Sequence, residues 1–197
     1  MDGLVAKFRE RYDAPAKDAI WQQHSATFRR FWSDQVLAKG TGVIPDEICD
    51  VVIRVLSKWK TGRGELLDHL PMSFDQATMK TIEQIDVLWV KKRSIVRAIE
   101  VEHTTSVYSG LLRMADLLAM QPNLRIKLHI VAPLSRRDKV LREIRRPVFM
   151  LLEGGALADT CTYLSYETIA DIQGQEHLNR LSDKVLDDYE EKAQETD

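Results

Sequence analysis

Residues 85–114 read IDVLWVKKRSIVRAIEVEHTTSVYSGLLRM, and this stretch decides the fold. It begins with a run of β-branched, apolar and aromatic residues and is interrupted by charged residues at 91–94. An apolar run resumes over residues 95–101 and then gives way to the spacing of an amphipathic helix. The pattern predicts two strands joined as a hairpin by a tight turn and followed by a helix.

Acidic residues mark the ends of both predicted strands. Asp86 lies near the start of the first strand, and Glu100 and Glu102 lie near the end of the second. Because side chains two apart on a strand point to one face, Glu100 and Glu102 project together, with the carbonyl of Val101 between them. A hairpin that turns at residues 91–94 brings Asp86 level with that pair. Three carboxylates in one place repel one another and are costly to desolvate, so the pattern predicts a cation among them.

The chemistry of such a site follows from its ligand types. Mg²⁺ prefers hard oxygen ligands in near-octahedral geometry and keeps several waters. A bound ion of this kind polarises a phosphate and lowers the pKa of a coordinated water. We therefore expect Asp86, Glu100 and the Val101 carbonyl to bind Mg²⁺, with Mn²⁺ as a substitute. Glu102 would orient the attacking water or help to bind a second ion.

The same acids also have a structural interpretation. Asp86 would then be an exposed residue at the start of a strand, and Glu100 and Glu102 an edge-facing pair. The balancing cations would come from across the hairpin, namely Lys91, Lys92 or Arg97. This interpretation does not explain why acids interrupt an otherwise apolar strand.

Length and composition limit the class of protein. With 197 residues, 44% hydrophobic and 29% charged, the chain can bury one good core. It has no run of about 18 apolar residues and no secretion-type leader, so we expect a soluble, cytoplasmic protein without a membrane partner. Cys49 and Cys161 lack metal-type spacing and are expected to be reduced thiols. The net charge of −2 conceals an acidic stretch at residues 176–197, with eight acids against three bases.

Outside the hairpin, the sequence predicts mostly helices. Helical patterns cover residues 1–11, 17–39, 45–59, 75–84, 104–120 and 135–145, and further helices begin at residues 166 and 175. Residues 126–132 form a further predicted strand and residues 160–164 a predicted edge strand. Gly110 lies inside a predicted helix, where close approach to the sheet would explain it. The predicted organisation is a helical extension at 1–42, a main domain at 43–174 and an acidic helix at 175–197.

Two sets of residues are candidates for contacts with nucleic acid. Residues 135–146 carry six bases against two acids, so this helix could neutralise backbone phosphates, although a solvated helix explains the charges equally well. Hydroxyl groups after the second strand could bind phosphates beside the metal, although helix capping accounts for several of them. The candidates are Thr104, Ser106, Tyr108, Ser109, Arg113, Arg136 and Arg137.

The spacing of the acids resembles a known nuclease motif. The motif begins with Ile85 and Asp86 and continues, after thirteen further residues, with Glu100-Val101-Glu102. These residues lie on two successive predicted strands that a helix follows. This arrangement resembles the PD-(D/E)XK nuclease superfamily. The similarity covers about residues 44–165 and implies an α/β, restriction-endonuclease-like mixed β-sheet flanked by helices, here with an α-helical N-terminal extension. Glu102 stands in place of the motif lysine, as it does in some restriction enzymes, and Ile85 stands in place of the motif proline.

The resemblance implies a function and its partners. Asp86 and Glu100 take the places of the two metal-binding acids, which implies a Mg²⁺-dependent endodeoxyribonuclease that hydrolyses phosphodiester bonds in restriction, defence or repair. Because duplex cleavage usually needs two active sites, a homodimer is expected by analogy. The alternative is a catalytically inactive DNA- or protein-binding subunit of a larger defence or repair complex. The lysine-to-glutamate change at Glu102 favours this alternative.

Overall fold

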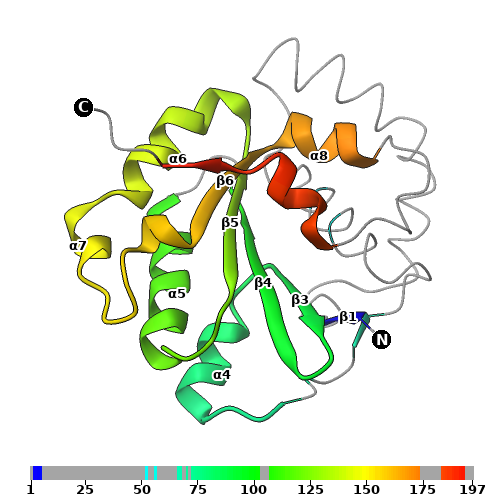
Figure 1. Ribbon diagram of the computed structural model, residues 1–197, viewed down its shortest axis with the longest axis vertical. Helices are drawn as coiled ribbons and strands as arrows, with labels where there is room; N and C mark the ends of the chain where they lie inside the picture. The colour runs from blue at the N-terminus through cyan, green and yellow to red at the C-terminus, as the bar shows by residue number, and fades with distance from the viewer. Residues whose placement is uncertain are drawn as a thin grey trace.

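A computed structural model describes residues 2–5, 52, 56, 66–67, 70, 72–102, 107–173 and 183–193 of the protein (Figure 1). In this part of the chain, seven strands form a single mixed sheet in the order β2-β1-β3-β4-β5-β6-β7. The strands are β1 (Asp2–Val5), β2 (Leu66–Leu67), β3 (Val87–Lys91), β4 (Ser94–Val101), β5 (Lys127–Ala132), β6 (Cys161–Ser165) and β7 (Glu191–Lys192). The predicted α/β fold class, a mixed sheet flanked by helices and consistent with a restriction-endonuclease-like fold, is confirmed.

The centre of the sheet contains the predicted hairpin. Strands β3 and β4 are antiparallel, with Val87 opposite Ile99 and Lys91 opposite Ser94. Their turn has two residues, and Lys92 adopts a positive φ of 57°, as two-residue hairpin turns require. Strand β4 then pairs in parallel with β5, which pairs in parallel with β6.

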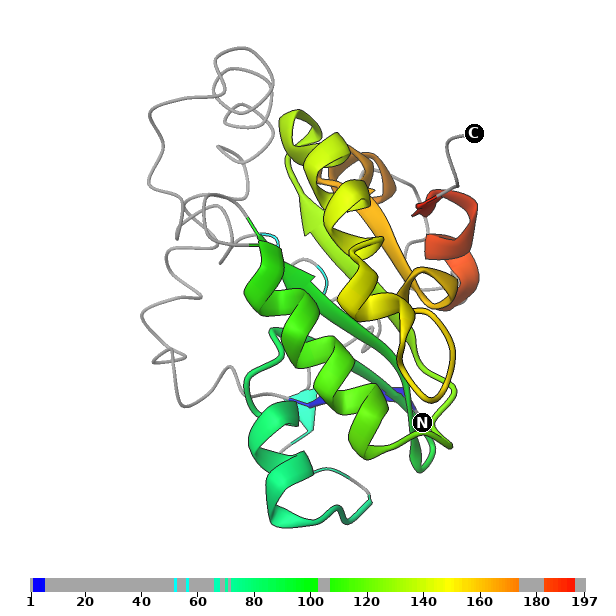
Figure 2. The same cartoon turned by 90° about the vertical axis from the view of Figure 1, so that its left-hand side faces the viewer.

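Helices cover one face of the sheet, as Figures 1 and 2 show. Leu88, Ala98 and Ile130 alternate toward this face and pack with Leu111 and Met114 in the largest described hydrophobic core. Asp75 caps the first of these helices by accepting hydrogen bonds from the backbone N–H groups of residues 77 and 78. The helices on this face are α4 (Gln76–Ile82), α5 (Val107–Met120), η2 (Leu134–Arg136), α6 (Arg137–Ile144), α7 (Pro147–Met150) and η3 (Leu157–Asp159). Helix α8 (Tyr166–Gln173) lies on the opposite side of the sheet (Figure 1).

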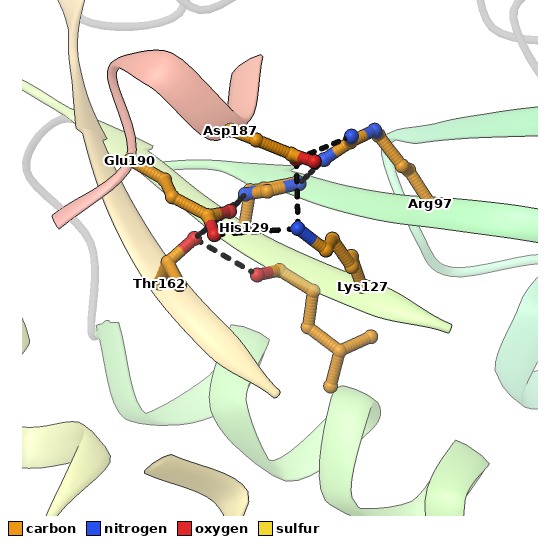
Figure 3. A network of polar contacts seen from close by, with 7 residues as sticks. Arg97, Lys127, His129, Thr162, Asp187 and Glu190 are labelled. Atoms are coloured by element: carbon orange, nitrogen blue, oxygen red, sulfur yellow. Dashed lines mark hydrogen bonds and ion pairs between the residues drawn. The ribbon is translucent and has the colours of Figure 1, made fainter. Parts of the chain in front are cut away.

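The opposite face of the sheet is covered in part by the C-terminal segment. The 3-10 helix η5 (Asp183–Asp188) crosses this face, and β7 follows it and pairs antiparallel with β6. A network of polar contacts joins the segment to the sheet through Asp187 and Glu190 (Figure 3). The indole N–H of Trp89 on the same face donates to the carbonyl of Leu56 at 3.1 Å.

Three expectations for secondary structure were wrong. Asp2–Val5 forms β1, antiparallel to β3, rather than part of a helix over residues 1–11, because these residues complete the sheet beside the hairpin. Residues 183–193 form a 3-10 helix and a strand rather than a continuation of an acidic helix, because Asp187 and Glu190 bind cations and hydroxyls of the sheet. Strand β6 is not an edge strand, since β7 pairs with it.

Several other expectations concern residues that the structure does not describe. The helix predicted at 17–39, most of that at 45–59, and Cys49 lie outside the described part of the chain. The division into domains at residues 42 and 174 stays a prediction. Cys161 is a free, fully buried thiol. None of the described helices is both long enough and apolar enough to span a membrane.

Candidate functional site

The three predicted acids converge at one end of β4. Asp86 directly precedes β3, and its Oδ2 accepts a 2.9 Å hydrogen bond from the backbone N–H of Val101, the last residue of β4. Glu100 is fully buried and Glu102 is only 4% exposed. The predicted hairpin therefore does bring Asp86 level with the end of the second strand.

Glu100 and Glu102 lie together beneath helix α5. A Cβ atom added to Gly110 would lie 3.0 Å from Oε1 of Glu102 and 3.3 Å from Cβ of Glu100. Both acidic side chains therefore point to the face that α5 covers, as the two-residue spacing on a strand predicts. The close approach of α5 to β4, expected from the glycine within the helix, is confirmed.

The cation that balances Glu100 comes from α5 and not from the hairpin. Arg113 donates from Nε to Oε1 at 2.9 Å and from Nη2 to Oε2 at 2.6 Å, so both carboxylate oxygens are engaged. This two-point geometry is the strongest form of an arginine–carboxylate pair. Among the cations named by the structural interpretation, Arg97 instead pairs with Asp187 on the opposite face, and Lys91 is exposed.

The acids influence one another electrostatically. Burial raises the pKa of Glu100 to about 8, the Arg113 hydrogen bonds oppose this increase, and the negative charges of Asp86 and Glu102 add to it. The pKa of Arg113 is raised in turn, chiefly by its hydrogen bonds to Glu100. One guanidinium can balance only one of three carboxylates. Full ionisation of the cluster therefore requires more positive charge, which a divalent cation would supply.

The residues present fit a magnesium ion by their chemistry. All three side chains offer hard carboxylate oxygens, and the adjacent backbone of Val101 offers a carbonyl. Within the described ranges, no group of three His, Cys, Asp or Glu side chains is placed to hold a metal ion by itself. Mg²⁺ does not need such a cage, since it is usually bound by one or two carboxylates with waters and substrate phosphates completing the shell.

The predicted phosphate contacts near the acids have mixed outcomes. Thr104 and Ser106 lie outside the described residues. Ser109 is half-buried near the start of α5. The ring of Tyr108 packs against Phe149, with centroids 5.7 Å apart, and the guanidinium of Arg146 lies 4.9 Å from its centroid. Arg113, also predicted to contact nucleic acid, pairs with Glu100 within the acidic cluster.

The basic helix predicted at 135–145 is present as η2 followed by α6. Arg136 is half-buried at the end of η2. Arg137 is engaged by Glu191 of β7 at 2.6 Å and by Asp138 at 2.9 Å. Arg137, Arg142 and Arg145 line a hollow between α6 and the C-terminal segment, and acids of that segment line it too. Of these arginines, Arg142 is the exposed one.

Sequence reasoning missed a partly buried polar network on the opposite face of the sheet. Its members are the side chains of Arg97, Lys127, His129, Thr162, Asp187 and Glu190 (Figure 3). The available signal was the alternation of Lys127 and His129 with apolar residues along β5, which places two polar groups on a face other than that of the main core.

Comparisons with known proteins relate the chain to restriction enzymes. A family model described as the type II restriction enzyme NmeDI C-terminal domain matches residues 56–193. The type II restriction enzyme NmeDI of Neisseria meningitidis serogroup C is 31% identical over 123 residues. That alignment covers 61% of this chain and 33% of the enzyme, so the chain spans about a third of the length of this relative. No solved structure matches the chain.

Proposed function

The chain belongs to the NmeDI C-terminal domain family of type II restriction enzymes, and from this premise we propose that it is a metal-dependent endonuclease that hydrolyses phosphodiester bonds in DNA. The observation that carries the proposal is the convergence of Asp86, Glu100 and Glu102 at the end of β4, inside the matched range. This arrangement also supports a place in the PD-(D/E)XK superfamily. The expected restriction, defence or repair role, homodimer and cytoplasmic location are parts of this proposal.

In the proposed site, Asp86, Glu100 and the carbonyl of Val101 would hold Mg²⁺ or Mn²⁺. When bound, such an ion would polarise the scissile phosphate and stabilise the charge that develops during in-line attack by water. The Val101 N–H fixes the orientation of Asp86. Glu102 is placed beside Glu100 beneath Gly110, where its carboxylate could accept a proton from the attacking water.

A second candidate is a catalytically inactive member of the family that binds DNA or a partner protein. The observation in its favour is the pairing of Arg113 with both oxygens of Glu100, because this pairing uses the acid structurally. The glutamate at position 102 points the same way, since it adds negative charge where the superfamily motif has a lysine.

The test combines metal binding with plasmid cleavage. Mg²⁺ and Mn²⁺ binding would be measured by calorimetry for the wild type and Asp86→Asn, which keeps an acceptor for the Val101 N–H but loses the charge. Asp116→Asn, at an exposed position of α5, is the matched control. We expect metal binding and plasmid nicking for the wild type and the control but not for Asp86→Asn. A wild type that binds no metal and leaves the plasmid supercoiled would support the inactive binding module.

A further inference from the structure

The Glu100–Arg113 pair bears directly on how a metal could bind. Both Glu100 oxygens accept hydrogen bonds from Arg113, and the Glu100 side chain is only 1% exposed. The carboxylate therefore already has a cation in the position where the proposed function needs a metal. A divalent ion at the same oxygens would lie within a few ångströms of the guanidinium, where the two positive charges repel each other strongly.

Only one partner of this pair is free to move. Glu100 is held within β4 and covered by α5, with Gly110 directly above its Cβ and Cγ. The Arg113 side chain is 26% exposed and is therefore open to solvent on one side. A long arginine side chain can swing its charged group into water, or toward a substrate phosphate, while its stem stays on the helix.

We propose that Arg113 occupies the cation position on Glu100, and that a divalent ion binds there only when it displaces the guanidinium from the carboxylate. This inference rests on the proposed function, because it takes Glu100 to be a metal ligand. Arg113 thus acts as a positioning residue. It holds Glu100 in a fixed orientation without metal and lowers the apparent affinity for the metal. Its displaced charge becomes available to the phosphate of a bound DNA strand.

The experiment measures metal affinity rather than activity. Calorimetric titrations with Mn²⁺ would compare the wild type, Arg113→Met and Arg113→Lys. Methionine keeps a long unbranched side chain without charge or donors, and lysine keeps the charge but loses the two-point geometry. Arg125→Met is the control, because Arg125 is exposed in the turn before β5. We expect the Kd to fall about tenfold or more in Arg113→Met, to fall roughly threefold in Arg113→Lys and to stay unchanged in the control.

A second readout follows the guanidinium itself. Proton exchange at Nε of Arg113, assigned by its absence from the spectrum of Arg113→Lys, should be slow without metal and should accelerate on addition of Mg²⁺. Unchanged or weaker Mn²⁺ binding by both Arg113 variants, with a wild type that does bind Mn²⁺, would overturn the displacement proposal alone. If neither the wild type nor any variant binds Mn²⁺, the proposed metal site itself fails. Arg113→Lys keeps the test decisive if Arg113→Met does not fold without metal.

Discussion

Arg97 on β4 donates a 2.7 Å hydrogen bond from Nη1 to Nε2 of His129 on β5, inside the protein. Because arginine has no acceptor, Nε2 must accept, and the imidazole proton of a neutral His129 lies on Nδ1. Nδ1 then donates to Oγ1 of Thr162 at 2.8 Å. The threonine hydroxyl is left to donate its one proton to Oε2 of Glu190 at 3.3 Å or to the carbonyl of Leu128 at 3.4 Å (Figure 3). The contact of 3.8 Å between His129 and Glu190 is therefore not an ion pair in this tautomer.

The buried histidine predicts a pH dependence of stability. Burial, and then the charges of Arg97 and Lys127, lower the pKa of His129 to about 3 from its usual value of 6.5. The unfolded chain binds this proton at higher pH than the native protein does. Stability is thus complete above pH 6.5 and falls as the pH is lowered from about 6.5 to 3, with a slope of up to ~1.4 kcal/mol per pH unit from this group.

The measurement is urea unfolding of the wild type and of His129→Gln between pH 7 and 4. Other groups contribute to acid sensitivity in both proteins, so the informative quantity is the difference in slope. We expect His129→Gln to be less stable at pH 7 but to lose less stability on acidification. Equal slopes in the two proteins would mean that His129 titrates normally.

Substitution of Arg97 should weaken the attachment of residues 183–193 to the sheet. Its guanidinium, only 3% exposed, bridges His129 and Asp187, so Arg97→Met leaves both without this partner. We expect a loss of about 3 kcal/mol in the free energy of unfolding and faster proteolysis within residues 183–193. Arg93→Met, at an exposed position in the hairpin turn, is the control and should change stability by less than about 0.5 kcal/mol.

Local patterns explain why the hairpin, α5 and the acids could be predicted from sequence. The apolar runs before Lys91 and after Ser94 indicate two strands and their turn, and the two-residue period of a strand places Glu100 and Glu102 on one face. Strand β1 has no such signal. It contains four residues and is stabilised by pairing with residues 88–91, far away in the chain, so its own sequence could not reveal it.

The sequence could not show that Arg113 is the cationic partner of Glu100, because this contact depends on how α5 packs against the sheet. From the sequence, Arg113 was a candidate contact for nucleic acid. The structure nevertheless brings its guanidinium to Glu100, because Gly110 lets the helix lie close to β4. The position of His129 among polar partners likewise depends on the C-terminal segment, which was predicted to be an acidic helix.

The close packing at Gly110 predicts the effect of adding one methyl group. Alanine normally stabilises a helix by about 1 kcal/mol relative to glycine. In Gly110→Ala the new Cβ would lie 3.0 Å from Oε1 of Glu102 and 3.3 Å from Cβ of Glu100, so these two side chains must shift by a few tenths of an ångström. We expect a net loss of roughly 1 kcal/mol in stability together with weaker Mn²⁺ binding. Gly154→Ala, where no atom lies within 4 Å of the added Cβ, should leave both unchanged.

Glu102 is predicted to act in the chemical step. Glu102→Gln keeps the shape of the side chain and removes its capacity to take up a proton at neutral pH. We expect plasmid nicking at saturating Mg²⁺ to fall by about 10² or more, as loss of a general base typically causes. Glu153→Gln, at an exposed position in the loop after α7, should cleave at the wild-type rate. Cleavage by Glu102→Gln at the wild-type rate would remove Glu102 from the mechanism.

Arginines of α6 should differ in their contribution to DNA binding. Each phosphate contact made by a cation contributes about one unit to the slope of log K against log salt concentration. Arg137 is neutralised by Glu191, whereas Arg142 is exposed at the hollow between α6 and the C-terminal segment. We therefore expect Arg142→Gln to reduce the magnitude of the slope by about one unit and Arg137→Gln to reduce it much less.

The binding would be measured by fluorescence anisotropy with a labelled duplex, in the presence of EDTA so that no cleavage occurs. Arg125→Gln, in the turn before β5, should keep the wild-type slope. Equal reductions for Arg137→Gln and Arg142→Gln would mean that DNA displaces Glu191 from Arg137 on binding. An unchanged slope for Arg142→Gln would mean that α6 does not contact the DNA backbone through this residue, and the DNA-binding surface would have to be sought elsewhere on the domain.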